Sequence, residues 1–545
     1  MEDTYTITGQ IVDVFRDRLY PGKVTIKDRR IFSLTPLKSA PERLICPGFI
    51  DAHIHIESSF LTPAAFAATA VVHGTIGAVA DPHEIANVLG VTGIKFMVEN
   101  GHEAPFYFSW GAPPCVPATS YETTGGKITY EDVAYLLALP EIGHLAEVMN
   151  YPGVLKKDLE LMKKIDLAKS LCKPIDGHAP LLRGEDLSRY IAAGISTDHE
   201  STSCDEAREK IEKGMKIILR GGSIANNLDE LLPLFEDLPD SLMFSADDIH
   251  ASDLLKGHIN LCVKKALEKG VPFFEAIKAA TLNPVKHYAL KVGLLQEGDS
   301  ADFIVISDAS TMEIEATYIQ GRCVAAEGKT KIKAVSTHPI NNFRRSPLKL
   351  EELQIVTQKG LMRVIRVLEG QLHTESELVE PSMDGNFVVS DQKRDILKLV
   401  VVNRYDAKSK PAIAFVRGFG LKNGALATSV AHDAHNIIAV GVDDHDLLQA
   451  INLVIKHRGG LACVDGREKV IMPLPVAGLM SLEEAKMVAE IEKELNHAAQ
   501  SLGTKFKYPF TNLSFLSLLV IPKLKLSDRG LFDGETFRFT PLFLQ

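Results

Sequence analysis

Short apolar runs alternate with longer amphipathic segments between residues 44 and 292. The apolar runs predict eight strands, at residues 44–50, 75–80, 105–109, 144–148, 174–176, 194–197, 216–219 and 242–245. The amphipathic segments predict the helices between them, for example at residues 156–172, 182–193, 204–213 and 254–269. This alternation predicts an α/β fold, a (β/α)8 barrel of the TIM type, whose active site lies at the carboxyl ends of the strands.

The segments on either side of this barrel have strand patterns. Before it, short strands are predicted at residues 7–14, 23–26 and 31–34, with a turn at Tyr20-Pro21-Gly22. This segment is too small for a core of its own, and further strands are predicted at residues 301–306 and 313–324. We therefore expect a small β-sandwich-like domain from residues 1–46 plus 293–335, and a barrel domain at residues 47–292.

The last third of the chain predicts a separate domain. Residues 336–349 are polar and read as a linker. Residues 350–545 then predict a C-terminal α/β domain. Its strands are predicted at residues 397–402, 412–416, 437–442 and 515–521, and its helices at residues 446–457 and 482–502.

Composition narrows the class of protein. The 545 residues carry 60 Lys plus Arg against 70 Asp plus Glu, a net charge of −10, which gives no reason to expect nucleic acid or a membrane surface as a partner. Seven scattered cysteines without a C-x-x-C pair predict reduced thiols. No signal peptide and no apolar run of ~20 residues is visible. We expect a soluble cytoplasmic protein.

Two histidines end the first predicted barrel strand. His53 and His55 are spaced i, i+2, and residues two apart in an extended strand project to the same side. Such a pair can direct two imidazoles at one metal ion, or it can be two solvent-exposed histidines at the end of a strand. The motif alone leaves both interpretations open.

Further metal-ligating residue types follow other predicted strands. Most strand ends carry an imidazole or a carboxylate, which is where a barrel places its active-site groups. These residues are His83 and Glu84 after the second strand, Glu147 on the fourth, His178 after the fifth, His199 after the sixth, and Asp247 and Asp248 after the eighth.

Imidazoles and carboxylates suit first-row divalent metals, and the lack of cysteine ligands argues against a closed structural zinc site. The predicted ligands are more than one open site needs, and they are His53, His55, Glu147, His178, His199 and Asp247. Two ions therefore fit, with Glu147 bridging them and Asp247 taking the proton from a water held between them. The chemistry indicated is metal-assisted hydrolysis.

Other polar residues have two or more interpretations. His83 and Glu84 could bind substrate or a metal-linked water, while Glu84 could instead serve the start of the next helix. Asp248 could contact a ring nitrogen of the substrate or make a hydrogen bond at the strand end. A second cluster at His432, Asp433 and His435 could reach over the barrel mouth, bind its own metal or satisfy a buried turn, and the turn is favoured.

The set of ligands resembles the amidohydrolase superfamily and, within it, the adenine deaminase family. Long runs carry this resemblance from about residue 5 to the end of the chain, including Asp528-Arg-Gly-Leu-Phe-Asp533. The other matching runs are at residues 47–59, 79–90, 146–154, 177–180, 191–200 and 429–437.

The resemblance implies the activity of that family. A metal-activated hydroxide would attack C6 of adenine and release ammonia, leaving hypoxanthine, as in purine salvage. It also implies two manganese or iron ions, with Glu147 where many relatives use a carboxylated lysine. Asp247 would be the proton shuttle, and His199 a ligand that steadies the developing charge. A homo-oligomer, taken as a dimer, is expected.

Two departures from the family pattern stand out. The family usually reads Thr-Asp-Asp-Arg-His after strand eight, whereas this chain has Ala246 and Ile249 in place of the Thr and the Arg. A glycine-rich segment of the C-terminal domain is replaced by residues 406–411. The alternatives are another cyclic amidohydrolase, acting on a different purine, a hydantoin or an imidazolone ring, and a metal-free scaffold that keeps the barrel for assembly.

Overall fold

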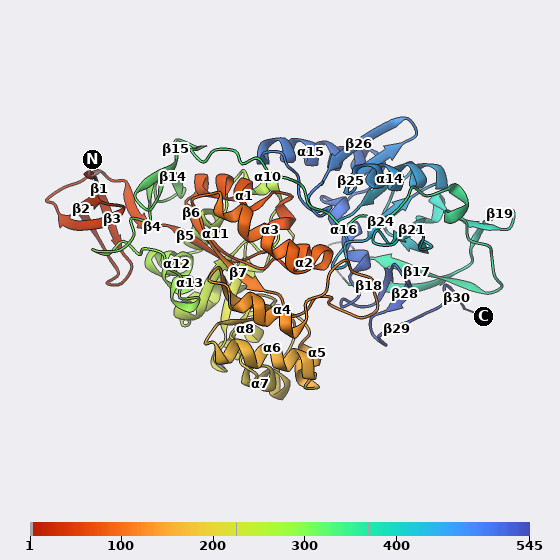
Figure 1. Ribbon diagram of the computed structural model, residues 1–545, viewed down its shortest axis with the longest axis horizontal. Helices are drawn as coiled ribbons and strands as arrows, with labels where there is room; N and C mark the ends of the chain where they lie inside the picture. Colours follow the sequence, from red (N-terminus) through yellow and green to blue (C-terminus); the bar gives the residue numbers. More distant parts are fainter. Residues whose placement is uncertain (1–3, 225, 369–370, 372, 545) are drawn as a thin grey trace. The chain divides into compact units, whose positions relative to one another are not determined.

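Parallel strands alternate with helices from residue 49 to residue 287 of this α/β chain, as the computed structural model shows (Figure 1). The structure describes residues 4–224, 226–368, 371 and 373–544, so residues 1–3 and 545, at the outer ends of the predicted domains, lie outside it. The chain divides into two units. The barrel unit contains residues 1–83, 94–115 and 128–337, and the second unit contains residues 84–93, 116–127 and 338–545.

Eight short parallel strands lie at the centre of the barrel unit. Five pair in chain order, β5 to β9, and three more pair as β10-β11-β12. Their bounds are β5 Phe49–Ile54, β6 Thr75–Ala80, β7 Tyr107–Ala112, β8 Ile142–Val148, β9 Ile175–Gly177, β10 Thr197–Asp198, β11 Lys216–Arg220 and β12 Leu242–Ser245. Strands β5, β6 and β12 are wholly buried, which suits the continuous apolar runs of parallel sheets covered on both faces.

Backbone hydrogen bonds link the two groups of strands. Asp247 N donates to His53 O at 2.9 Å and His55 N donates to Asp247 O at 3.2 Å, so the chain after β12 lies beside β5. At the other edge, Ser196 N donates to Ile175 O at 2.9 Å, just before β10. The sheet is therefore curled, as in a TIM-like α/β fold.

Helices follow most of these strands and cover the curled sheet (Figure 1). Helix α4 begins with a capping box between Thr129 and Asp132, and the Ser203 side chain caps α8. Among the described residues, no helix combines the length and apolar character that a membrane crossing requires. The helices of the barrel unit are α1 Pro63–Ala70, α3 Val91–His102 from residue 94 on, α4 Tyr130–Leu137, α5 Tyr151–Leu155, α6 Leu159–Ser170, α7 Gly184–Ala192, α8 Cys204–Glu212, α9 Leu228–Leu231, α10 Ala251–Leu254, α11 Ile259–Glu268, α12 Phe273–Ala280 and α13 Leu282–His287. Helix α2 His83–Leu89 belongs to the second unit after its first residue.

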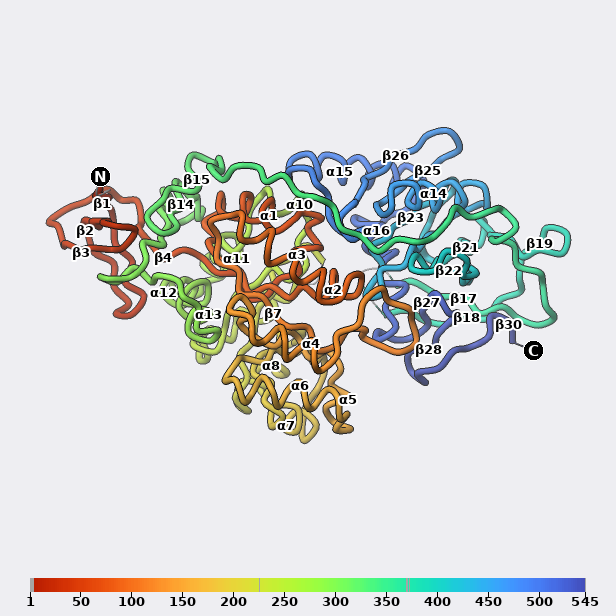
Figure 2. The backbone as a smooth tube through the Cα atoms, in the orientation of Figure 1, coloured from red at the N-terminus to blue at the C-terminus, as the bar shows by residue number. Residues whose placement is uncertain are grey.

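Both flanks of the barrel contribute to one eight-stranded sheet, ordered β16-β15-β14-β13-β4-β1-β2-β3. The red N-terminal strands and the green strands β14 and β15 belong to it (Figure 2). Phe303, Ile11 and Val24 pack in its core. Its strands are β1 Thr4–Asp13, β2 Arg18–Lys27, β3 Arg30–Pro36, β4 Leu44–Pro47, β13 Phe303–Asp308, β14 Glu313–Ile319, β15 Arg322–Ala326 and β16 Lys329–Thr330.

Three predicted elements of this region are wrong. Residues 313–324 are not one strand but the antiparallel pair β14 and β15, with a turn at Gln320 and Gly321. Residues 44–50 are not one strand. Residues 44–47 form β4 of the eight-stranded sheet, which we call the flank sheet, and β5 of the parallel sheet begins at residue 49. Gly48 lies between the two strands, where an added Cβ would be 2.4 Å from Ile76 Cδ1. The predicted turn at Tyr20-Pro21-Gly22 lies inside β2, where Pro21 is paired opposite Gln10 of β1 and Gly22 makes room for Ile11.

The second unit is built on a nine-stranded mixed sheet ordered β18-β17-β22-β21-β24-β23-β25-β26, with β30 paired to β17. Helix α14 packs on it through Leu447 and Ile451, against Val400 and Ala439. The elements are β17 Leu361–Val367, β18 Thr374–Val379, β19 Ser382–Asp384, β20 Phe387–Val389, β21 Ile396–Val402, β22 Ala412–Arg417, β23 Ala425–Thr428, β24 Ile437–Gly441, β25 Gly460–Asp465, β26 Glu468–Pro473, β27 Leu524–Ser527, β28 Gly530–Asp533, β29 Arg538–Phe539, β30 Phe543–Leu544, α14 Asp444–His457, α15 Ala485–Ser501 and α16 Pro509–Ser514.

The strand predicted at residues 515–521 is wrong. Helix α16 starts with Pro509 and continues into a 3₁₀ turn, η7 Phe515–Ser517. Residues 513–519 are all buried, so their hydrophobic pattern alone does not distinguish a helical turn from a buried strand. The other short 3₁₀ helices are η1 Ile56–Ser59, η2 Val71–His73, η3 Leu232–Glu236, η4 Pro239–Ser241, η5 Leu350–Leu353 and η6 Gln392–Arg394.

The flank sheet offers a matched test of its core. Phe303 is fully buried, whereas Phe32 on the same sheet is 64% exposed. Phe303→Ala should lower the free energy of unfolding by about 3–5 kcal/mol, because it leaves a cavity. Phe32→Ala should change it by less than ~0.5 kcal/mol. Urea unfolding followed by circular dichroism measures both, and equal effects would contradict this description of the core.

Candidate metal centre

The histidines at the end of β5 face an aspartate that follows β12. The two Nε2 atoms of His53 and His55 lie 3.2 Å apart. Asp247 Oδ1 is 3.2 Å from His55 Nε2 and 3.7 Å from His53 Nε2. Three donor atoms from opposite ends of the barrel sequence therefore converge on one point.

Glu147, on β8, lies between two groups of imidazoles. Its Oε1 is 3.6 Å from His55 Nε2. Its Oε2 is 3.3 Å from His199 Nε2 and 2.7 Å from His178 Nδ1. The two oxygens of one carboxylate thus face different histidines, which is the arrangement that a bridging carboxylate needs.

The six predicted ligands fit a divalent metal centre. Nitrogen and oxygen ligands about 2.1 Å from a cation lie about 3 Å from one another. The distances given above, from 2.7 to 3.7 Å, are of this size. All six residues are buried except His178, whose side chain is 30% exposed. Such clustering of buried lone pairs is what a bound cation stabilises.

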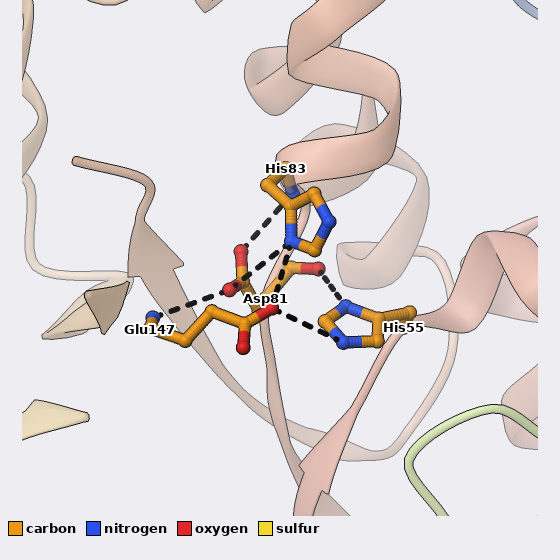
Figure 3. A group of neighbouring side chains, drawn as sticks. All are labelled: His55, Asp81, His83 and Glu147. Atoms are coloured by element: carbon orange, nitrogen blue, oxygen red, sulfur yellow. Dashed lines mark hydrogen bonds and ion pairs between the residues drawn. The ribbon is translucent and has the colours of Figure 1, made fainter. Parts of the chain in front are cut away.

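Hydrogen bonds behind the ligands fix their orientation (Figure 3). His55 Nδ1 lies 3.1 Å from the carbonyl oxygen of Asp81, so a proton on Nδ1 leaves the Nε2 lone pair free for a metal. The Asp81 carboxylate accepts from the backbone N–H groups of His83, at 3.0 Å, and Glu147, at 3.3 Å. Asp81, directly after β6, therefore makes hydrogen bonds to ligands from both neighbouring parts of the sheet, His55 after β5 and Glu147 on β8.

Asp51 joins the first strand to the last beneath the centre. Its Oδ1 accepts from the backbone N–H groups of His53, at 3.2 Å, and Ala246, at 3.1 Å. Its Oδ2 is 2.9 Å from His258 Nε2. Asp247, next to Ala246, has a left-handed backbone with φ 54°, a conformation that the paired strands around it maintain.

Burial and neighbouring charges act against each other on the ligands. Burial alone would raise the pKa of Glu147, but His178 and His199 outweigh it and hold that pKa well below its usual range. The pKa of Asp247 is also low, because His55 and Arg220 outweigh burial. Both carboxylates are therefore ionised acceptors, ready to bind a cation.

A buried ion pair supports the strand that carries His199. Lys210 Nζ donates to Asp198 Oδ2 at 2.8 Å, to Glu206 Oε1 at 2.7 Å and to Ala179 O at 2.8 Å. Burial acts to raise the pKa of Asp198, but Lys210 and His199 lower it to about 2. The ammonium thus keeps a buried carboxylate ionised directly beside a predicted ligand.

The predicted substrate contacts fall in different places. His83 Nδ1 lies 3.4 Å from Glu147 Oε1 and 3.3 Å from Asp81 Oδ2, within the centre. Asp248 Oδ1 accepts from Ser58 Oγ in the barrel unit. Glu84 lies in the first turn of α2 and belongs to the second unit.

Glu84 is bound by the second histidine cluster, within the second unit. Its Oε1 is 2.9 Å from His432 Nδ1, and its Oε2 pairs with His435 Nε2. His435 Nδ1 accepts from Ala431 N at 3.3 Å, so the proton of the neutral ring lies on Nε2 and is donated to Glu84. Burial lowers the pKa of His435 to about 4, which keeps the ring neutral. The same three side chains lie close enough together to hold a metal ion, so both the buried turn and a separate metal fit this geometry.

Sequence reasoning missed three residues of the centre. Asp81 was visible in the Asp-Pro-His motif but was not assigned a role. Glu200 directly follows His199, and Arg220 ends β11. All three follow or end strands of the curled sheet, and Asp81 and Glu200 are residue types that can bind a metal. Arg220 is not, so a search for metal-ligating residue types at strand ends passes over it.

Comparisons with known proteins cover the whole chain. Residues 44–324 match the family model "Amidohydrolase family", and residues 371–538 match "Adenine deaminase C-terminal domain". Proteins named adenine deaminase from Salinibacter ruber and Parabacteroides distasonis are each 48% identical, over 100% and 99% of both chains respectively. One from Methanosarcina mazei is 44% identical over 98% of this chain and 99% of its own.

The buried pair under His199 predicts a strong effect on stability. Lys210→Met leaves the charge of Asp198 buried without its partner and should lower the free energy of unfolding by about 3–5 kcal/mol. Lys213→Met on the same segment removes a partly exposed pair with Glu209 and exposed hydrogen bonds to Gly184 and Ser188, and should cost ~1 kcal/mol or less. Chemical denaturation of both variants measures this.

The pH dependence follows from the low pKa of Asp198. A carboxyl whose pKa is lowered by folding adds stability above its unfolded pKa of about 3.9, and that stability is lost as the pH falls towards the folded pKa. In Lys210→Met the buried, unpaired Asp198 has a raised folded pKa, so the gap in stability between wild type and variant should narrow as the pH falls from that raised pKa towards the wild-type value of about 2. Denaturation series across this range measure it, and a constant gap would contradict the pairing.

Proposed function

The chain belongs to the adenine deaminase family within the amidohydrolases and converts adenine to hypoxanthine and ammonia; we propose that it does so at a two-metal centre on the strand ends. The full-length identity of 48% to curated adenine deaminases supports the reaction. The single observation that supports the centre is the convergence of six nitrogen and oxygen ligands, Glu147 among them, at the strand ends.

The proposed ligand set has Glu147 as the bridge between two metal positions. The other ligands are His53, His55, His178, His199 and Asp247. Nitrogen and oxygen donors without thiolates suit manganese(II) or iron(II), which we propose as the metals. Metal ions bound there would lower the pKa of a coordinated water from ~16 towards ~7 and so supply a nucleophile at neutral pH.

Asp247 is the proposed proton shuttle. Its ionised carboxylate takes one proton from the attacking water and returns it to the exocyclic nitrogen of adenine. The new C6–O bond forms, the C6–N bond breaks, and the nitrogen leaves as ammonia. Asp247 ends the cycle unprotonated, so no other reactant is needed.

His199 is proposed to steady the charge that develops at C6, from its position beside Glu147. His83 also lies in the centre, which supports a role in binding substrate or a metal-linked water. Contacts of adenine with Glu84 and Asp248 stay predictions. Each Glu84 oxygen already pairs with an imidazole, so a hydrogen bond from adenine would have to use a remaining lone pair of that carboxylate.

We propose that the eight strands close into a full (β/α)8 barrel, supported by the hydrogen bonds between β5 and Asp247 and between residues 175 and 196. The domain boundaries at residues 46, 292, 335 and 349, a cytoplasmic location and a homodimer stay predictions of the sequence.

The reaction has a direct test. The chain is purified without metal, reconstituted with manganese(II) and incubated with adenine, and the ultraviolet spectrum is followed. We expect the adenine band to shift to that of hypoxanthine, with one ammonia released per purine consumed. If the protein left adenine unchanged but hydrolysed a hydantoin, it would be a cyclic amidohydrolase of the alternative class and the proposed reaction would be wrong.

The bridging role of Glu147 predicts the behaviour of one variant. Glu147→Gln removes the negative charge between the two metal positions, so it should bind fewer than two metal ions and lose more than about 100-fold in kcat. Glu141→Gln, just before β8, is the matched control and should behave as wild type. Metal analysis and the adenine assay measure both, and wild-type metal content in Glu147→Gln would rule out the bridge.

A further inference from the structure

Arg220 ends strand β11 with its guanidinium buried beside two carboxylates. Its side chain is 7% exposed. Its Nη1 donates to Asp247 Oδ2 at 2.9 Å and also to Glu200 Oε1. An arginine stays charged at any working pH, so it places a permanent positive charge at the rim of the proposed metal centre.

The two oxygens of Asp247 have different partners. Oδ1 faces His55 and His53, whereas Oδ2 is held by Arg220. A carboxylate fixed at one oxygen by a charged donor presents the other in a set direction. Arg220 therefore decides which oxygen of Asp247 points to the metal position and prevents the side chain from rotating away from it.

Glu200 is a potential competitor for the metal. Its Oε1 lies 3.6 Å from His199 Nε2 and 3.9 Å from His178 Nδ1, so together these three residues could hold a cation. Arg220 binds this same oxygen. The guanidinium thus competes with a cation for the Glu200 oxygen that faces the two imidazoles, and leaves Glu147 as the carboxylate between them.

The residues on either side of the two aspartates offer no competing donor to Asp247. Ala246 and Ile249 are both buried and have no side-chain hydrogen-bond donor. Strand β11 pairs directly with β12, with Arg220 opposite Ser245. A guanidinium from the neighbouring strand therefore reaches Asp247 without help from residue 249.

We propose that Arg220 is a positioning residue of the metal centre, which fixes Asp247 towards His53 and His55 and keeps Glu200 out of the ligand set. This inference rests on the proposed ligands. Without the guanidinium, Asp247 is free to turn, and Glu200 is free to bind the cation between His178 and His199.

The test compares Arg220→Met with Arg208→Met, which removes an arginine paired with Asp237 on the exposed surface of the same unit. The manganese-loaded variants are mixed with EDTA, and metal release is followed together with kcat and KM. Arg220→Met should release one metal ion at least about tenfold faster than wild type and lose about 100-fold in kcat. KM should change far less than kcat, and Arg208→Met should match wild type in all three.

Two additions separate positioning from a general effect on folding. Guanidinium chloride at millimolar concentration, well below denaturing levels, should restore part of the kcat of Arg220→Met and none in wild type. Adding Glu200→Gln to Arg220→Met removes the competing ligand and should return the absorption spectrum of the cobalt(II)-loaded protein towards that of wild type.

Wild-type metal release and kcat in Arg220→Met would overturn the proposal. If that variant does not fold, Arg220→Lys and Glu200→Gln are measured in the same way, and both matching wild type would overturn it equally. A wild-type protein that deaminates adenine but never binds two metal ions would overturn the proposed centre and this inference together, without affecting the reaction.

Discussion

The burial of two carboxylates side by side with four imidazoles is the constraint on which this structure depends. Taking a carboxylate out of water costs on the order of several kcal/mol, and Glu147 and Asp247 are both buried. The protein offsets this cost with positive and hydrogen-bonding partners: His178 and His199 around Glu147, and His55 and Arg220 around Asp247. Cations bound between them would offset it further, so the stability of the centre and its affinity for metal have one physical origin.

The curled sheet solves the problem of bringing these groups together. Each strand ends at the same rim, so residues that are distant in the chain meet there without long loops. The polar groups behind the rim are just as specific: Asp81 and Asp51 accept backbone and ring hydrogens that set the directions of the histidines. The buried ammonium of Lys210 donates to Asp198 and so holds the end of β10, directly before His199.

Much of this could be predicted from the sequence, because the ligands follow predicted strands and a parallel barrel brings strand ends together. The prediction failed where packing overrides local pattern. The apolar run at residues 44–50 is uniform, so nothing in its hydrophobicity shows that Gly48 passes the chain from one sheet to another. Arg220 was missed because arginine is not a metal ligand, although the sequence places it directly after a predicted strand. The grouping of residues 84–93 and 116–127 with the second unit is a long-range property that no local pattern carries.

The central claim is that a pair of metal ions lies on either side of Glu147. Anomalous X-ray scattering at the manganese edge, from crystals of the manganese-loaded protein, tests it most directly. The account predicts two peaks about 3.5–4 Å apart, one beside His53 and His55 and the other beside His178 and His199. A single peak, or two peaks away from Glu147, would contradict it.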